Sequence, residues 1–527
     1  MIEPVPSDTA PPEDASPSDA SPPPSRLRRG LILATTVLGS SLAFIDGSVV
    51  NVALADMQRE LGATVGDLQW IANSYMLTLA ALLLLGGAFG DRIGRRRIFI
   101  LGLVIFSLAS VACALADIAE TLIVARAFQG IGAALLVPNS LAILSASYPR
   151  DKRGRAIGAW SAFAAVFSAG GPVLGGWLVD SFGWASVFWI NPPIAAAALV
   201  LALVSVRENR SPQARGDLDW LGGLLAMLGL GMVSYALIQA GETGFDPRIG
   251  LGAAVLGVLA LVLFVRVEAR TAMPLLPLRL FASREFTAAN LLTLLLYGAL
   301  GAAVFLFPFG LIRLYGYTAT EAGAAFLPFA LMLFLLARWG GTLIDRYGAR
   351  MPLVAGSVIT AVGLGMLAIP TSGAPYWATF LPGVLVLGLG MAVSIPPLTT
   401  GVMNAVDDRH AGIASAVNNA ASRVAFLIAV AAVGPLLLTA FNWLQAPLMA
   451  EIEMPEPVRE AIRRDPGRLA DLTAPDGAGA AGPLIVAAAR EALIDAFRVA
   501  TVGLAVLAAA SGLVAWVMYP KTSRRKG

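Results

Sequence analysis

Apolar runs of about 20 residues, separated by short polar segments, follow one another along most of the chain. A helix of that length crosses a hydrocarbon core of about 30 Å. The pattern therefore predicts an all-α polytopic membrane protein with fourteen transmembrane helices. The predicted helices lie near residues 30–52, 68–89, 98–116, 119–146, 155–180, 184–206, 218–240, 248–268, 285–313, 321–343, 352–370, 376–403, 411–440 and 490–519.

Lys and Arg are unevenly distributed between the two sets of loops. An even number of spans places both termini on one side, and the loops and tails of that side carry about 25 cationic residues against roughly 8 on the other. Because positive charge marks the cytoplasmic side, we expect both termini in the cytoplasm and the chain in the cell membrane, or the inner membrane of a Gram-negative bacterium. These cations are spread over short loops, which argues against a nucleic-acid partner.

Three polar segments lie outside the predicted helices. Residues 1–29, rich in Pro, Ser, Asp and Ala, predict a disordered cytoplasmic tail, and residues 520–527 a basic cytoplasmic tail. Basic residues before the first apolar run resemble a signal peptide, but many further spans follow, so we reject cleavage. We expect residues 441–489 to form a partly helical, solvated extracytoplasmic loop.

Composition supports the membrane class and removes several kinds of chemistry. Hydrophobic residues make up 57% of the 527-residue chain and charged residues 13%, against about 25% charged in soluble proteins. The single Cys113 and single His410 leave no disulfide framework, metal cluster or Ser-His-Asp triad. The sequence also lacks a Walker-type loop, a G-x-S-x-G elbow and H-E-x-x-H. We therefore expect no enzyme, no metal site and no cofactor.

The motif G-x-x-x-D-R-x-G-x-R occurs twice, at residues 87–96 and 341–350. The copies lie eight predicted helices apart, so the two halves have the same orientation, as in one architecture of secondary transporters. This predicts two parallel-related six-helix bundles, at 30–206 and 285–519. The two inserted helices at 218–268 are expected to form a peripheral pair with no buried charge.

The repeated motif predicts a conformational latch on the cytoplasmic face. Its glycines let helix ends approach closely, its Asp can accept hydrogen bonds or face a helix N-terminus, and its arginines lie near anionic lipid. The alternative is a simple tight loop with snorkelling cations. The predicted latch residues are Gly87, Asp91, Arg92, Gly94, Arg95 and Arg96, with Gly341, Asp345, Arg346 and Gly348 in the second copy.

Three further segments carry a family resemblance. They are Ile45-Asp46-Gly-Ser-Val-Val-Asn51-Val-Ala-Leu in span one, Leu122-Ile-Val-Ala-Arg126-Ala-Phe-Gln129-Gly130-Ile-Gly132 in span four, and Gly171-Pro172-Val-Leu-Gly175-Gly176 in span five.

With the loop at 87–97, these segments resemble the motifs of the major facilitator superfamily, specifically its fourteen-helix drug:proton antiporter family, over about residues 30–519. Three positions depart from the family pattern: Ser48, where Thr is usual, Ala55, where Pro is usual, and Phe167, where a glycine is expected. The resemblance implies proton-driven efflux of small, often amphipathic compounds.

Asp46 and Arg126 are ionisable residues deep within predicted spans, where such residues are typical of functional sites. At 1.5 Å per residue both lie roughly 20 Å from the cytoplasmic edge. We expect them to face one cavity and to be coupled in proton exchange, because burial disfavours a carboxylate and a nearby arginine favours it. The alternative is a permanent ion pair that fixes helix packing.

Gly171, Pro172, Gly175 and Gly176 predict a bent, closely packed helix at the interface between the halves, which controls leak. Generic glycine packing is the alternative. Other polar and aromatic residues are candidates for a solute cavity, although for the aromatic residues packing in the core or against lipid is favoured. The candidates are Asn51, Asn73, Tyr75, Asn290, Tyr297, Asn418 and Arg423.

Arg423 lies roughly 18 Å into its span, with no acid at comparable depth in the second half. Contact with substrate and helix packing are both open interpretations, and packing is favoured. Arg338 is expected to snorkel at the cytoplasmic edge. One deep acid and two deep cations favour a neutral or monovalent substrate over a dication.

These observations predict a secondary active transporter that exports small hydrophobic or amphipathic compounds by proton antiport and alternating access. The alternative within the same architecture is a carrier of a dedicated lipid, amino acid or metabolite, possibly a symporter. A non-transporting receptor is disfavoured by the cost of burying Asp46 and Arg126. The expected partners are a small-molecule substrate, protons and membrane lipids, with no obligate protein partner evident.

Overall fold

The computed structural model describes residues 25–209, 219–240, 246–271, 274–369, 375–406, 411–464 and 466–520. Residues 1–24 and 521–527, His410, and the side chains of Arg338 and Asp345 lie outside the described part. Within that part all regular structure is helical, so the predicted fold class is confirmed.

The chain forms a long series of helices in which the predicted spans can be identified. The first half contains α1 (Arg26–Leu61), α2 (Val65–Ile93), α3 (Arg95–Ala114), α4 (Ala119–Ser147), α5 (Arg150–Phe182), α6 (Ser186–Trp189) and α7 (Asn191–Ser205). The inserted pair is α8 (Trp220–Gln239) and α9 (Pro247–Glu268). The second half contains η1 (Leu278–Ala282), α10 (Arg284–Tyr315), α11 (Ala319–Ala324), α12 (Leu327–Tyr347), α13 (Arg350–Met366), α14 (Tyr376–Asn404), α15 (Ala411–Ala450), α16 (Glu456–Arg464), η3 (Pro466–Asp471), η4 (Gly479–Ala481) and α17 (Gly482–Met518).

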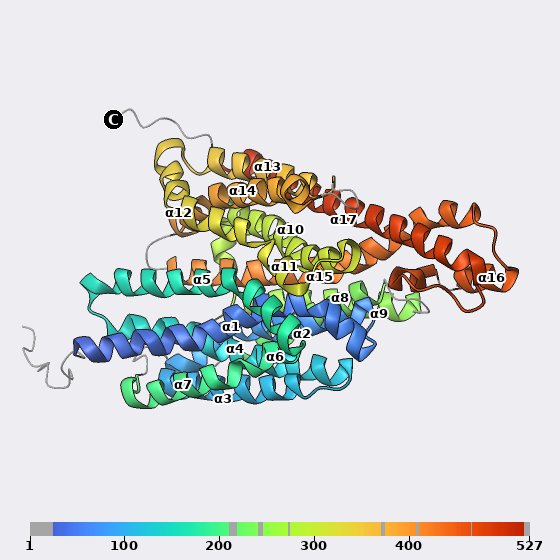
Figure 1. Cartoon of the computed structure of the whole chain (residues 1–527). Helices are drawn as coiled ribbons and strands as arrows, with labels where there is room; N and C mark the ends of the chain where they lie inside the picture. The colour runs from blue at the N-terminus through green and yellow to red at the C-terminus, as the bar shows by residue number, and fades with distance from the viewer. Residues whose placement is uncertain are drawn as a thin grey trace, which may run out of the picture.

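Twelve helical segments of the described chain are long and apolar enough to cross a membrane. The 33-residue α5 and the 17-residue apolar α13 also coincide with predicted spans. The expected number of fourteen fits this arrangement. Figure 1 shows the start of α1 and the end of α17 toward the same side of the molecule, as an even number of crossings requires.

The two halves repeat one packing scheme. In the first half α2 and α3 pack on α4, α1 packs on α5 and α7, and α3 packs on α7. The corresponding pairs in the second half are α12 and α13 with α14, α10 with α15 and α17, and α13 with α17. The five matching pairs agree with the internal repeat seen in the polar motifs.

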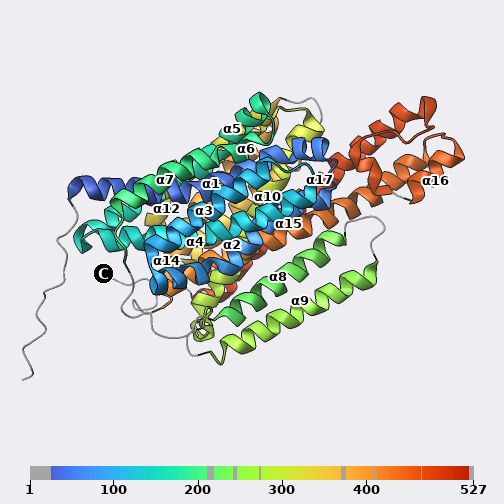
Figure 2. The same ribbon diagram turned by 90° about the horizontal axis from the view of Figure 1, so that it is seen from below.

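The inserted helices lie at the periphery (Figure 2), where α8 packs on α2 and α15 and α9 packs on α8. The expectation that they bury no charge is wrong. Asp219 and Glu268 are 8% and 2% exposed. Asp219 caps the start of α8, where its carboxylate accepts from the free backbone N–H of Gly222 at 2.7 Å. Glu268 is the last residue of α9 and accepts from the backbone N–H of Leu276, in the segment that follows the helix, at 2.9 Å.

Several helices extend beyond the apolar runs. The first helix continues to Leu61, and ends where Gly62 adopts a left-handed φ of 62°. Helices α15 and α17 continue well into the segment expected as a loop at 441–489, and α16 lies at their far end (Figure 1). Burial of Val458 and Ile462 holds α16 against its neighbours.

Candidate functional site

The centre of the first half is an ion pair between α1 and α4. An Nη1 atom of Arg126 donates to Oδ2 of Asp46. The side chains of Asp46 and Arg126 are 0% and 2% exposed. Arg126 Nε also donates to the carbonyl of Ile71 at 3.1 Å. A buried charge pair requires such additional hydrogen bonds, because both charges have lost their hydration.

Three neutral polar side chains complete the hydrogen bonding of this pair. Gln129, one turn after Arg126, accepts from Arg126 Nη1 at 2.6 Å and donates to Asp46 Oδ1 at 2.7 Å. Ser110 on α3 accepts from Gln129 at 2.8 Å and from Asn191 on α7 at 3.2 Å. The Asn191 amide also donates to Asp46 Oδ1 at 3.4 Å. Side chains from four helices thus share one polar cluster.

Aromatic rings cover the cationic side of the cluster. The guanidinium carbon of Arg126 lies 4.4 Å from the ring centroid of Tyr75 and 5.8 Å from that of Phe188. Tyr75 is fully buried, and its hydroxyl donates to the carbonyl of Ala43 at 3.1 Å. The rings stabilise the guanidinium by cation–π contact and keep water away from it.

The structure brings the predicted Asp46 and Arg126 into direct contact, but closes both off from solvent in this conformation. Because both side chains are buried, the cavity expected around them is not open here. Ser110 and Asn191 were missed by the sequence reasoning. The only feature that marks these two residues in the sequence is that each is polar within an apolar run. Many apolar runs of the chain contain such a residue, so this feature does not single them out.

The glycine motif of α5 lies where the halves meet, on the side away from the termini. A Cβ atom at Gly176 would lie 2.3 Å from the Ala319 carbonyl oxygen of α11. Gly323 of α11 lies as closely against Pro172. Asp180 accepts from the backbone N–H groups of Ala319 and Thr320 at 3.1 and 2.8 Å. One half therefore caps a helix of the other.

The remaining glycines of the motif pack within the first half. Gly171 contacts Ser48 and Gly175 contacts Val49, both on α1. The motif therefore presses α5 against α1 on one side and α11 on the other, which small residues permit.

A second contact between the halves joins α2 and α15. Gln69 Nε2 donates to the carbonyls of Val430 and Ala431, and the Gln69 amide packs against Gly434. Gln69 is 1% exposed. This contact lies near the start of α2, which is also the side away from the termini.

The predicted latch makes its described contacts within the first half. Arg95 Nε donates to Asp91 at 2.9 Å, and the Glu208 carboxylate accepts from the backbone N–H groups of Arg96 and Arg97 at 3.1 and 3.2 Å. Gly94, with φ of 134°, forms the whole turn between α2 and α3. Arg92 is exposed, and Gly87 lies against Pro138 of α4.

The second copy of the latch motif is looser. Gly348 ends α12 with φ of 70°, and Gly341 has open space around it. Arg346 is exposed, with its guanidinium 5.3 Å from the ring of Tyr347. The latch function of both copies stays a prediction.

The cavity candidates divide into satisfied and unsatisfied groups. Asn418 of α15 donates to Thr293 at 2.7 Å and to Asn290 at 3.4 Å, both on α10. Tyr297 packs against the apolar core, and the Asn51 amide donates within its own helix to the Gly47 carbonyl at 3.4 Å. The Asn418 bonds join α15 to α10, whereas the Asn51 bond stays within α1.

Asn73 and Arg423 differ from the others. Asn73 is fully buried on α2, and neither its amide nitrogen nor its amide oxygen has a hydrogen-bond partner among the described residues. Arg423 on α15 is half-buried, and no described acid or carbonyl accepts from its guanidinium.

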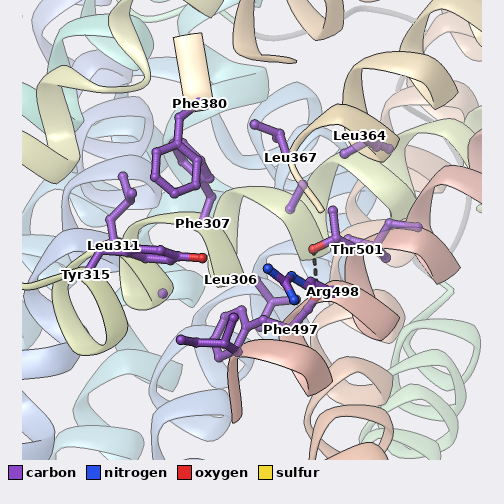
Figure 3. A pocket seen from close by; sticks show the side chains of 14 residues that line it. Leu306, Phe307, Leu311, Tyr315, Leu364, Leu367, Phe380, Phe497, Arg498 and Thr501 are labelled. Carbon is purple, nitrogen blue, oxygen red and sulfur yellow. Dashed lines mark hydrogen bonds between the residues drawn. The ribbon is translucent and has the colours of Figure 1, made fainter. Parts of the chain in front are cut away.

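A small apolar pocket lies within the second half (Figure 3). Figure 3 shows Phe307, Tyr315, Phe380 and Phe497 around it, with Arg498 at its edge. Arg498 pairs with Asp495 at 2.6 Å. None of the predicted site residues lines this pocket.

Comparison with known proteins places the chain among transporters. It is 36% identical over 414 residues to the methylenomycin A resistance protein of Bacillus subtilis, covering 78% of this chain and 88% of that protein. It is 32% identical to the drug efflux pump JefA of Mycobacterium tuberculosis, covering 94% and 99% of the two chains.

Solved structures agree on the fold. A bacterial homologue of the lysosomal transporter Spinster, in an inward-facing conformation, matches with a TM-score of 0.65 and 19% identity, over 94% of this chain and 98% of that one. A D-xylose–proton symporter matches with a TM-score of 0.59 and 14% identity, over 94% and 99%. Residues 36–430 match the Major Facilitator Superfamily, and the chain belongs to this family.

Proposed function

We propose that the protein is a secondary active transporter that exports small hydrophobic or amphipathic compounds in exchange for protons. The names of the relatives, which include resistance proteins and efflux pumps, support export. The observation that carries proton exchange is the Asp46–Arg126–Gln129 cluster, the one fully buried ion pair of the described chain.

The contacts between the halves support alternating access. Asp180, Gly176 and Gln69 join the halves on the side away from the termini, whereas the described latch contacts stay within one half. With both termini in the cytoplasm, this conformation is closed to the outside. Rocking about the cluster then breaks the outer contacts and forms inner ones.

In this conformation the Asp46 carboxyl group accepts from Arg126 and from two amide donors. Protonation removes the attraction to Arg126 and frees the guanidinium. A conformation that wets the cluster from outside loads the proton, and a conformation open to the cytoplasm releases it. The two states of one carboxylate thereby bias the rocking equilibrium in opposite directions.

Purified protein in liposomes tests this proposal. With a pH gradient imposed, the wild type should export members of a compound panel and move protons only when a substrate is present. Asp46→Asn should abolish the pH-driven component, whereas Asp117→Asn, an exposed acid, should leave it intact. Full pH-driven exchange in Asp46→Asn would rule out the proposed coupling.

The same liposomes separate export from the alternative, symport of a dedicated solute. Antiport accumulates substrate on the acidic side of the membrane, and symport on the opposite side. Movement of one solute only, in the direction of the proton flow, would favour the symporter.

A further inference from the structure

We propose that Arg423 binds an anionic group of the transported compound, so that the preferred substrates are amphipathic monoanions such as aromatic carboxylates. This proposal rests on the proposed function and adds the chemical class of the substrate. Burying a guanidinium in the middle of a membrane protein without a counter-charge costs free energy. Such residues therefore pair with an acid, a carbonyl or a ligand.

The surroundings of Arg423 supply none of these partners among the described residues. The other deep cation, Arg126, has an acid, an amide and a carbonyl as acceptors. No described side chain or carbonyl accepts from Arg423, and yet its side chain is only half-buried. A half-buried side chain about 18 Å into α15 indicates that accessible space reaches this depth.

The face of α15 that carries Arg423 is directed toward the first half. Arg423, Leu427 and Val430 lie on one stripe of the helix, and the carbonyl of Val430 accepts from Gln69 of α2. Along this stripe exposure falls from Asn419, which is exposed, through Arg423 to Leu427 and Val430, which are fully buried. Arg423 is thus the last accessible side chain before the closed contact between the halves.

The first half presents polar and aromatic groups at the same level. Arg423 lies about 10 Å below Val430, and Tyr75 lies about 9 Å below Gln69 on the antiparallel α2. Tyr75 is close enough to Arg423 for an electrostatic interaction. Asn73, one turn from Gln69 on the same face, is fully buried with an unpartnered amide. An anionic group at this position accepts from Arg423, and the Asn73 amide provides a further donor.

Binding of a matched pair of probes tests the proposal. The probes are 2-naphthoate and 2-naphthamide, which have nearly the same shape and differ in charge. Equilibrium dialysis against the purified, detergent-solubilised full chain should give tighter binding of 2-naphthoate. Arg423→Gln should weaken 2-naphthoate binding about tenfold or more and leave 2-naphthamide binding unchanged.

Two further variants keep the result interpretable. Arg423→Lys retains the charge and should restore most of the preference, and Arg266→Gln, an exposed arginine on peripheral α9, should have no effect. The proposal is overturned if the wild type binds both probes equally well. It is also overturned if Arg423→Gln weakens the binding of both probes equally while Arg423→Lys is folded and binds both as the wild type does.

The binding experiment can fail or succeed independently of the transport experiment that tests the proposed function. A charge preference that depends on Arg423, without any substrate-dependent proton flux in liposomes, would retain the anion site and reject proton exchange. Proton-coupled export without the preference would do the reverse.

Discussion

Gln129 and Asp46 are joined by a hydrogen bond of 2.7 Å from the amide Nε2 to the carboxylate Oδ1. The opposite end of the same amide accepts from Arg126 at 2.6 Å. One neutral side chain thus contacts both members of the buried ion pair and also reaches Ser110 of α3. The amide fixes how the two charges are oriented, so the pair depends on a residue that carries no charge.

Replacement of Gln129 tests this dependence. Gln129→Leu leaves Asp46, Arg126 and Ser110 each with one fewer hydrogen bond in a site closed to solvent, which should cost about 1–3 kcal/mol. Gln129→Glu cannot donate to Asp46 and should destabilise the fold further. Thermal unfolding in detergent measures both effects. Phe128→Leu, an exposed neighbour on α4, is the control; equal stability of all three variants would contradict the orienting role.

The close approach of α5 and α11 predicts an effect of added volume. In Gly176→Ala the new Cβ would lie 2.3 Å from a backbone oxygen of Ala319, whereas in Gly170→Ala it would meet open space. Gly176→Ala should therefore hold the halves apart at this side and reduce export, while Gly170→Ala should not.

The distance between spin labels on α5 and α11 measures whether the two helices separate. Cys113 is the only cysteine of the chain and is fully buried, so introduced cysteines can be spin-labelled selectively on α5 and α11. Gly176→Ala should lengthen the label distance. An unchanged distance in Gly176→Ala would show that the helices adjust without separating.

Asp180 makes a prediction about the same contact without adding volume. It accepts two backbone N–H groups at the start of α11, and loss of a helix N-cap costs about 1 kcal/mol. Asp180→Ala should shift the balance between closed and open outer sides by about fivefold toward the open state, as measured by the same labels. Glu321→Ala, which removes the capping-box acceptor of Thr318 N within α11 itself, should not open the contact; if it does so to the same extent, the stability of α11 and not the bridge is responsible.

For the buried acids of the inserted helices we expect a substitution that stabilises the protein. Asp219 Oδ2 and Glu268 Oε1 are both buried acceptors without a described donor, and the two carboxyl groups lie close enough to hydrogen-bond. Glu268→Gln supplies an amide donor and should raise the stability by about 1 kcal/mol. Glu268→Ala also loses the bond to Leu276 N and should lower it. Thermal unfolding of the two variants shows whether stability rises or falls in each. A loss of stability in both would argue that one of the two carboxyl groups is already protonated and donates to the other.

The sequence determined the class of this protein because the membrane imposes a simple rule. Spanning segments must be long, apolar and helical, so the spans, their even number and the repeated polar motif at 87–96 and 341–350 are readable from local patterns. Depth along a helix is also local, since each residue adds about 1.5 Å. This placed Asp46 and Arg126 at one level, and the structure shows them in contact.

Only the tertiary structure decided which side chains of different helices meet. Ser110 and Asn191 lie in ordinary apolar runs, and their role follows from the rotation of α3 and α7 about their axes, which no local pattern fixes. The bridge from Asp180 to α11 and the contact of Gln69 with α15 join residues about 140 and 361 positions apart. Such contacts depend on how the halves are docked, and docking is set by the summed packing of many helices.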